Sequence, residues 1–167
     1  MNSTGLHADG PEPQPIGRID RFIGEYRFLS NFYPAAISDN AGRVYPSVEH
    51  AYQAAKANSE AERSHIAESR TPKKAKHRGS KLVPTAGWEN RKRDIMRELL
   101  LKKFSPGSEL AGRLVATDDA ELIEGNLWGD IFWGVCNGVG ENHLGRLLME
   151  TRALLHGLPP ATDPDAR

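Results

Sequence analysis

Apolar side chains recur every three to four residues along most of this chain, the spacing of helices that cover a core. Ser47 and Thr71 stand just before two such stretches, where a hydroxyl can accept a hydrogen bond from the first free N–H groups of a helix. Pro72 suits a first helical turn. The pattern predicts helices from residue 48, over 60–69, from 72, over 88–104, over 108–116 and over 142–156.

Short extended stretches separate these helices. Residues 32–37 and 43–45 flank a turn cluster at 39–42, which predicts a hairpin, and 121–123 reads as a further strand. We therefore expect an α+β fold, predominantly helical, as a single compact domain over 21–156 with a few short strands. Glycine and proline dominate 1–20 and 157–167, which we expect to be flexible tails.

Composition narrows the function classes. The 167 residues hold 22 basic and 22 acidic side chains, so no overall positive field exists to grip a nucleic-acid backbone. Cys136 is the only cysteine, and no apolar run approaches the roughly 20 residues of a membrane helix. We expect a soluble cytoplasmic protein, with no metal because the histidines and the cysteine lack ligand spacing.

A first candidate stretch, 28–34, is rich in aromatic residues around Ser30 and Asn31. Aromatic rings stack on bases and an asparagine amide can pair with a base edge, so the stretch is typical of a base-binding wall. The alternative is a strand that enters the core through a polar turn.

A second stretch places Glu49, Gln53 and Lys56 on one helical stripe, at i, i+4 and i+7. With Ser47 as the N-cap, Glu49 lies in the first turn, where the helix dipole favours an anion. We expect this glutamate to stay ionised and to stabilise positive charge or activate water. The alternative is a solvated polar face.

A third stretch, 124–134, mixes glycines with Trp128, Trp133 and Asp130. If Asp130 is buried there, desolvation raises its pKa toward that of a proton donor; the alternative is a tight turn capped by the aspartate. The glycine-rich segment 138–146 runs into the last helix and is able to hold a phosphate on free N–H groups. The basic run 73–78 offers phosphate contacts or simply a wet helix surface.

Together these blocks resemble the NADAR family, also called YbiA-like, over about residues 22–152. The resemblance implies N-glycosidase activity without a cofactor, either on ribosylaminopyrimidine phosphates, the early intermediates of riboflavin synthesis, or on ADP-ribosylated guanine in nucleic acid. It matches Glu49, Trp88 and Asp130 to positions linked to catalysis, and Lys56 to the pocket. The matched substrate-binding positions are Ser30, Asn31, Phe32, Gln53, Trp128, Gly129, Asn142 and Gly145. Members often carry arginine after the glycine at 79, whereas this chain has Ser80, so a phosphate contact is either lost or replaced by Arg78 or Lys81.

The chemistry that we expect is cleavage of the bond between ribose C1 and a base nitrogen. Glu49 would stabilise the cationic sugar and orient water, Asp130 would protonate the leaving base, and Trp88 or Trp128 would stack on it. In a rival route, Lys56 attacks C1 of an opened sugar and forms a Schiff base. The alternative function is a non-catalytic module that binds ADP-ribose or a related nucleotide. The partner is thus a ribosylated nucleobase, a pyrimidine nucleotide or modified nucleic acid; the oligomeric state is not predicted.

Overall fold

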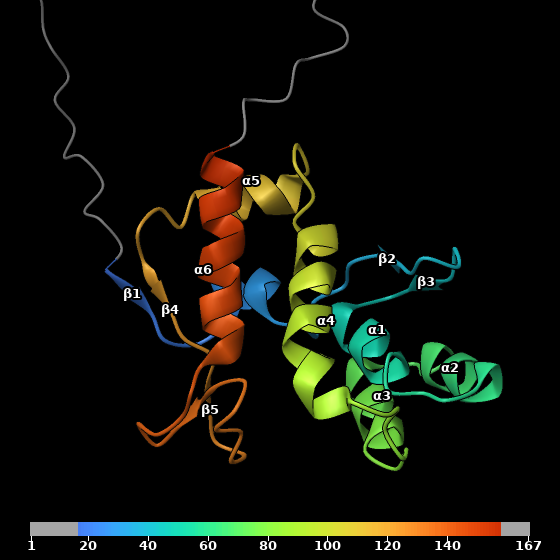
Figure 1. Ribbon diagram of the computed structural model, residues 1–167. Coiled ribbons are helices and arrows are strands. Elements are labelled where there is room, and N and C mark those ends of the chain that lie inside the picture. Colours follow the sequence, from blue (N-terminus) through green and yellow to red (C-terminus); the bar gives the residue numbers. More distant parts are fainter. Residues whose placement is uncertain (1–16, 158–167) are drawn as a thin grey trace, which may run out of the picture.

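The computed structural model describes residues 17–157, which form six α-helices, a short 3-10 helix and six strands of two residues each (Figure 1). The fold is predominantly helical, as the apolar periodicity predicted. Residues 1–16 and 158–167 lie outside the described part, so most of both expected tails lies there too. The predicted boundary of the N-terminal tail, residue 20, is wrong, because Arg18–Ile19 forms β1.

The first three α-helices begin where the sequence predicted, with Ser47 and Thr71 confirmed as the caps of the first and third. Helices α1 (Val48–Ala54), α2 (Glu60–Ala67) and α3 (Pro72–Gly79) have hydroxyl N-caps whose side chains accept a backbone N–H three residues on. At α2 the cap is a full capping box between Ser59 and Glu62. These caps satisfy N–H groups that have no partner inside the helix, and α1 packs against both α2 and α3.

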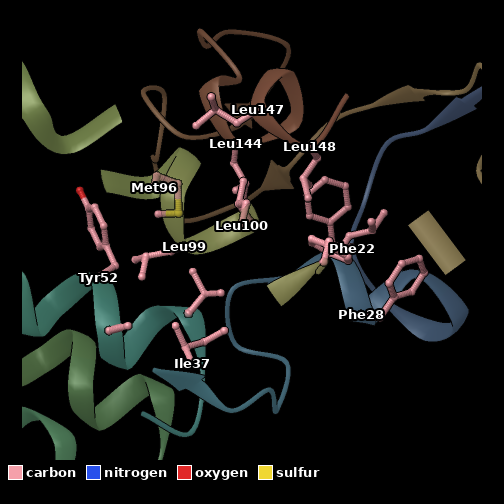
Figure 2. Close-up of a cluster of buried hydrophobic side chains, with 14 of the residues drawn as sticks. Phe22, Phe28, Ile37, Tyr52, Met96, Leu99, Leu100, Leu144, Leu147 and Leu148 are labelled. Carbon is pink, nitrogen blue, oxygen red and sulfur yellow. The ribbon is translucent and has the colours of Figure 1, made fainter. Parts of the chain in front are cut away.

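Two longer helices stand side by side and carry the core between them. Helix α4 (Trp88–Lys103) and helix α6 (His143–His156) pack together, while α5 (Glu109–Val115) lies against α6 (Figure 1). Leu100, Leu144 and Leu148 are fully buried at this contact, and aromatic rings from the 3-10 helix Gly24–Leu29 and the segment before it complete the cluster (Figure 2). Burial of such side chains contributes about 1.5–3 kcal/mol each.

The strands form three separate pairs. β2 (Ile37–Ser38) and β3 (Val44–Tyr45) are antiparallel, which confirms the hairpin, although its first strand is shorter than the predicted 32–37. β1 pairs in parallel with β4 (Glu121–Leu122), and β5 (Gly125–Asn126) pairs in parallel with β6 (Val135–Cys136). Among residues 17–157, no helix has both the length and the apolar character required to cross a bilayer.

Candidate active site

A cavity of about 620 Å³ opens where four distant parts of the chain meet. Helices α1 and α3 form one wall, the segment after the 3-10 helix a second, and the loop that contains β5 and β6 a third, with Met96 of α4 also in the lining. A volume of this size accommodates a small organic ligand. The lining residues are Ser30, Asn31, Phe32, Glu49, Tyr52, Gln53, Lys56, Lys73, Lys76, Met96, Glu124, Trp128, Asp130 and Trp133.

Helix α1 is buried along its whole length, and its polar residues point inward rather than to solvent. All seven residues from Val48 to Ala54 are buried, including Glu49 and Gln53. Gln53 Nε2 donates to Glu49 Oε1 at 2.7 Å. The solvated polar face considered for this stripe is therefore wrong. A buried glutamate with a single side-chain partner is costly for folding, and such costs are concentrated at functional sites.

The expectation that Glu49 simply stays ionised needs correction. Burial raises the pKa of Glu49 above its usual range, and the nearby charge of Asp130 acts in the same direction. The Gln53 hydrogen bond and the charges of Lys76 and Lys56 lower the pKa, but they offset only part of the burial effect.

Lys56 lies just beyond the end of α1 and reaches over aromatic rings. Its Nζ is 5.4 Å from the ring centre of Tyr52 and 5.6 Å from that of Trp88, which is cation–π geometry. Burial lowers the pKa of Lys56, while the charge of Glu49 raises it. Trp88 is buried and stacks on Tyr52 at 5.1 Å, outside the lining. The tryptophan thus supports the lysine and the tyrosine from behind the cavity wall.

Asp130 shapes the loop that closes the cavity. Its Oδ1 accepts the backbone N–H groups of Phe132 at 3.1 Å and Trp133 at 2.8 Å. The side chain of Asn126 in turn bonds both backbone groups of Asp130. Asp130 is half-buried rather than enclosed, so the apolar burial expected for it is absent. Of the two alternatives, the turn capped by the aspartate is confirmed, and the residue also belongs to the cavity lining.

Glu124, which the sequence interpretation passed over, lies in the same cavity. Burial raises the pKa of its carboxyl group to about 8, with a further contribution from the charge of Asp130. Its Oε2 is buried and makes no hydrogen bond with residues 17–157. The cavity therefore holds three carboxyl groups from two chain segments, together with the amines of Lys56, Lys73 and Lys76.

Two other buried side-chain oxygens also lack a hydrogen-bond partner within residues 17–157. Asn31 Oδ1 and Gln53 Oε1, like Glu124 Oε2, have no hydrogen-bond partner within the described residues. Buried polar atoms are normally paired, and all three belong to residues of the lining. Gln53 Oε1 lies against Gly79 of α3, so this oxygen belongs to the contact between α1 and α3.

Lys73 and Lys76 of α3 add positive charge to the cavity and are otherwise exposed to solvent. Lys76 Nζ is also 5.9 Å from the ring centre of Trp128. Arg78, expected as a replacement phosphate contact, instead donates to the carbonyl of His65 at 2.6 Å and to Ser69 Oγ at 3.1 Å. Lys81, the other expected replacement, is not in the lining. The basic run predicted over 73–78 thus contributes through two lysines and not through its arginine.

Two expected contacts lie at the start of α6 and serve the backbone. Asn142 accepts the N–H of Glu124 and donates to the carbonyl of Leu122. A side chain at Gly145 would collide with that same carbonyl, so helix and strand approach closely there. Gly129 has a φ of 85°, which glycine adopts without strain. None of the three is in the lining.

The phosphate site expected at the start of α6 is also absent from this position. The backbone N–H groups of Glu141, His143 and Leu144 donate to the carbonyls of residues 131–133. With these donors occupied, the helix N-terminus anchors the loop and does not present free N–H groups to an anion.

Comparison with known proteins agrees with this geometry. The NADAR domain model matches residues 21–156. The chain belongs to the NADAR domain family. N-glycosidase YbiA of Escherichia coli is 37% identical over 134 residues, which cover 78% of this chain and 82% of that protein. A riboflavin biosynthesis protein of Vibrio vulnificus is 35% identical over 136 residues, 80% of this chain but 36% of that protein.

A solved structure supports the fold as well. The NMR structure of the E. coli protein YbiA matches with a TM-score of 0.78 at 31% identity, covering 93% of this chain and 94% of that chain. The assignment to the NADAR family, and with it to the hydrolases of N-glycosyl bonds, is thereby confirmed.

Six lining residues were missed as candidates. Lys73 and Lys76 were read within a surface run, and Trp133 and Glu124 stood inside a quoted motif without a role. The apolar spacing of α1 assigned Tyr52 to the core. Met96 was read as part of an apolar helix face. Only the tertiary arrangement separates these from their neighbours.

Proposed function

We propose that this cavity hydrolyses the N-glycosidic bond of a phosphorylated ribosylaminopyrimidine. The observation that carries the proposal is the meeting of Glu49, Lys56 and the two loop acids in one cavity that Lys73 and Lys76 line on the α3 side. Breaking a ribose C1–N bond develops positive charge on the sugar, which fixed negative charge stabilises. Lysines at the rim suit the phosphate of the same substrate.

In the main route, Glu49 in its ionised form stabilises the sugar and orients the attacking water. The water oxygen bonds to C1, its proton passes to Glu49, and the bonding pair of the broken C–N bond leaves with the nitrogen. A raised pKa makes Glu49 a better base near neutral pH than an ordinary glutamate. Tyr52 and Trp133, whose ring centres lie 5.5 Å apart, supply an aromatic wall for the base.

In the rival route, Lys56 is the nucleophile. Burial lowers its pKa, which increases the neutral amine fraction that attacks carbon. The neutral amine adds to C1 of the ring-opened sugar and loses a proton, the base nitrogen departs with the bonding pair of the C1–N bond and takes up a proton, and water later hydrolyses the resulting Schiff base to the free sugar and the lysine amine. Borohydride added during turnover reduces such an intermediate to a stable adduct. An adduct lost in Lys56→Ala supports this route, and turnover without an adduct supports the water route.

The size of the cavity favours the small substrate. A volume of about 620 Å³ suits a single ribosylated base, whereas an ADP-ribosyl group attached to guanine extends well outside. Relatives named as riboflavin biosynthesis proteins occur in Vibrio vulnificus and Zea mays, at 35% and 33% identity. The zero net charge also suits a small molecule better than a nucleic-acid backbone.

One observation favours ADP-ribosylated guanine as the second candidate. Trp128 lines the cavity yet is 66% exposed, beside Lys76, and an exposed indole next to a lysine is able to stack on an unpaired base. Only a flipped or single-stranded guanine would need so little surface.

A parallel assay tests both candidates. The chain is incubated with the ribosylaminopyrimidine 5′-phosphate and with a single-stranded oligonucleotide that carries ADP-ribosylated guanine, and the released base and sugar are measured by mass spectrometry. Release from the small substrate with at least a tenfold higher kcat/KM supports the proposal. Preference for the oligonucleotide favours the second candidate. Binding without release from either substrate favours the non-catalytic nucleotide-binding module. The cytoplasmic location expected from the sequence stays a prediction.

A further inference from the structure

Glu124 is held firmly by its backbone while its carboxyl group is left without partners. Its N–H donates to Asn142 Oδ1 at 3.1 Å, and its carbonyl accepts the N–H of Val135 at 2.9 Å. A side chain at Gly134 would collide with this carbonyl, so the two chain segments approach as closely as glycine allows. Rigid backbone on both sides fixes where the Glu124 side chain can reach.

The carboxyl group itself lies in the cavity lining, beside Asp130 and near Glu49. Its Oε2 is buried without a hydrogen bond to any described residue. A buried carboxyl that served the fold would be paired with a donor, as Asp130 is with two N–H groups. An unpaired oxygen beside two other acids is instead suited to hold a proton and give it to a ligand.

We propose that Glu124 is the general acid that delivers a proton to the departing base nitrogen. This role rests on the proposed N-glycosidase function and replaces Asp130, the acid expected from the sequence. Asp130 Oδ1 is occupied by the N–H groups of Phe132 and Trp133, so this aspartate holds the loop and adds negative charge near the site.

The protonation of Glu124 supports this role. Burial, together with the charges of Asp130 and Glu49, raises the pKa of Glu124 to about 8 against the lowering effect of the Lys76 charge. Lys56 and Lys73 line the same cavity. Glu49 accepts a hydrogen bond from Gln53, whereas Glu124 Oε2 has no partner within the described residues, so no donor there favours the ionised form of Glu124. At neutral pH most molecules therefore carry the proton on Glu124.

The proposed step balances in either route. The O–H proton of Glu124 transfers to the nitrogen as the C1–N bond breaks, and the bonding pair becomes the nitrogen lone pair. Glu124 is left as a carboxylate. In the water route, the proton that Glu49 takes from water returns the site to its starting state through solvent. If Lys56 attacks C1 instead, the departing nitrogen needs the same proton.

The test compares Glu124→Gln, Glu124→Asp and wild type on the ribosylated substrate that wild type cleaves, with kcat/KM measured from pH 6 to 9.5. Glu121→Gln is the matched control, an exposed glutamate three residues earlier on the same segment. Wild type and the control should lose activity as pH rises through about 8. Glu124→Gln should lose about 100-fold or more in kcat and also lose this alkaline limb. Glu124→Asp should recover part of the rate together with an alkaline limb, displaced in pH because the shorter side chain holds its carboxyl group in a different position.

Binding of ribose 5-phosphate separates chemistry from structure. Each Glu124 variant should bind it within about threefold of wild type, because only the proton is removed. If Glu124→Asp lost affinity for ribose 5-phosphate by the same factor as it lost kcat, the role of Glu124 would be structural and the proposal would be overturned. So would an alkaline limb that persists in Glu124→Gln, or a kcat within about threefold of wild type. If Glu124→Gln does not fold, Glu124→Asp decides by the position of its limb: a limb unmoved and a full rate would contradict the acid role. No base release by wild type from either substrate would overturn the proposed function itself, and this role with it.

Discussion

Gln53 Nε2 donates to Glu49 Oε1 at 2.7 Å across one turn of α1, deep inside the protein. The amide fixes the orientation of the carboxyl group and leaves its other oxygen for the cavity. Residues four apart on a helix face each other, so this pairing needs no distant element. The chemistry of the site is thus oriented from within a single short helix.

Replacement of Glu49 by glutamine tests its charge at nearly constant shape. We expect Glu49→Gln to lower kcat by about 10²–10⁴-fold, because the variant neither stabilises a cationic sugar nor accepts a proton from water. The melting temperature should not fall, since the change removes a buried ionisable group. Glu109→Gln is the control, as an exposed glutamate in the first turn of α5 after an N-cap serine. A Glu49→Gln enzyme with near-normal turnover would defeat the assignment.

The position of Gln53 depends in turn on Gly79. A methyl group at residue 79 of α3 would collide with the Gln53 side chain, because α1 and α3 touch at this point. We expect Gly79→Ala to destabilise the fold by about 1–3 kcal/mol and to lower kcat as the amide moves off Glu49. Gly112→Ala in α5, where a Cβ meets open space, should instead leave kcat unchanged and stabilise by about 0.5–1 kcal/mol. Chemical denaturation and turnover of both variants check the pair.

The helices of this chain were predictable because their signals are local. Ser47, Ser59 and Thr71 each cap a helix through contacts within three residues. The parallel pairs β1–β4 and β5–β6 were missed, since a two-residue strand leaves no periodic pattern and its partner lies far along the chain. Of the strand expected over 32–37, only the last residue is extended in β2, because residues 31–33 form a turn at the cavity wall.

The site likewise has a part that local sequence signals predict and a part that depends on tertiary contacts. Glu49, Gln53 and Lys56 were predicted as one stripe of one helix, and the lining includes all three, although α1 ends before Lys56, which lies in the turn that follows. The protonation of the acids was not readable. Whether Asp130 or Glu124 is the more enclosed depends on which N–H groups the loop directs at each, and that follows from contacts with α6 and β6. Charge and burial at such a meeting point are properties of the tertiary structure.

The lysines of α3 lead to a prediction about substrate binding. We expect Lys73→Gln/Lys76→Gln to raise KM for a phosphorylated ribosyl substrate about tenfold or more while changing kcat little, because a charge-assisted contact to phosphate is lost equally in ground and transition states. Lys74→Gln on the same helix is the control, exposed and outside the lining. Steady-state kinetics on substrates with and without the phosphate decide the matter. A KM that rises equally for both would exclude a phosphate contact.

Lys103 predicts a pH-dependent stability. Its Nζ donates to the carbonyl of Ser30 at 2.7 Å, and burial lowers the pKa of Lys103 from 10.5 to about 7. Between these values the unfolded chain binds the proton and the folded chain does not, so this contribution to stability rises with pH from about 7 to 10.5. We expect Lys103→Met to remove this rise, by about 1–3 kcal/mol between pH 6 and 9.

Lys102→Met provides the control for that experiment, because Lys102 also donates to a backbone carbonyl, that of Ser38, but is exposed. Unfolding free energies from denaturant titrations at several pH values give the comparison. A parallel pH dependence of Lys103→Met and wild type would show that the buried amine does not titrate in this range.

For Glu124 we expect the opposite pH dependence, a contribution to the free energy of unfolding that falls as pH rises. Its pKa is raised from 4.5 to about 8, so the folded chain binds the extra proton between these values. The corresponding stability is complete below about pH 4.5 and is lost as pH rises through about 8. Glu124→Gln should therefore be more stable than wild type at pH 9 by about 1–3 kcal/mol and differ less at pH 5. Because Lys103 and Glu124 act in opposite directions, wild type alone shows a flattened profile between pH 7 and 8. Only the difference between each variant and wild type resolves the two, and a Glu124→Gln difference independent of pH would mean that this carboxyl ionises as it does in water.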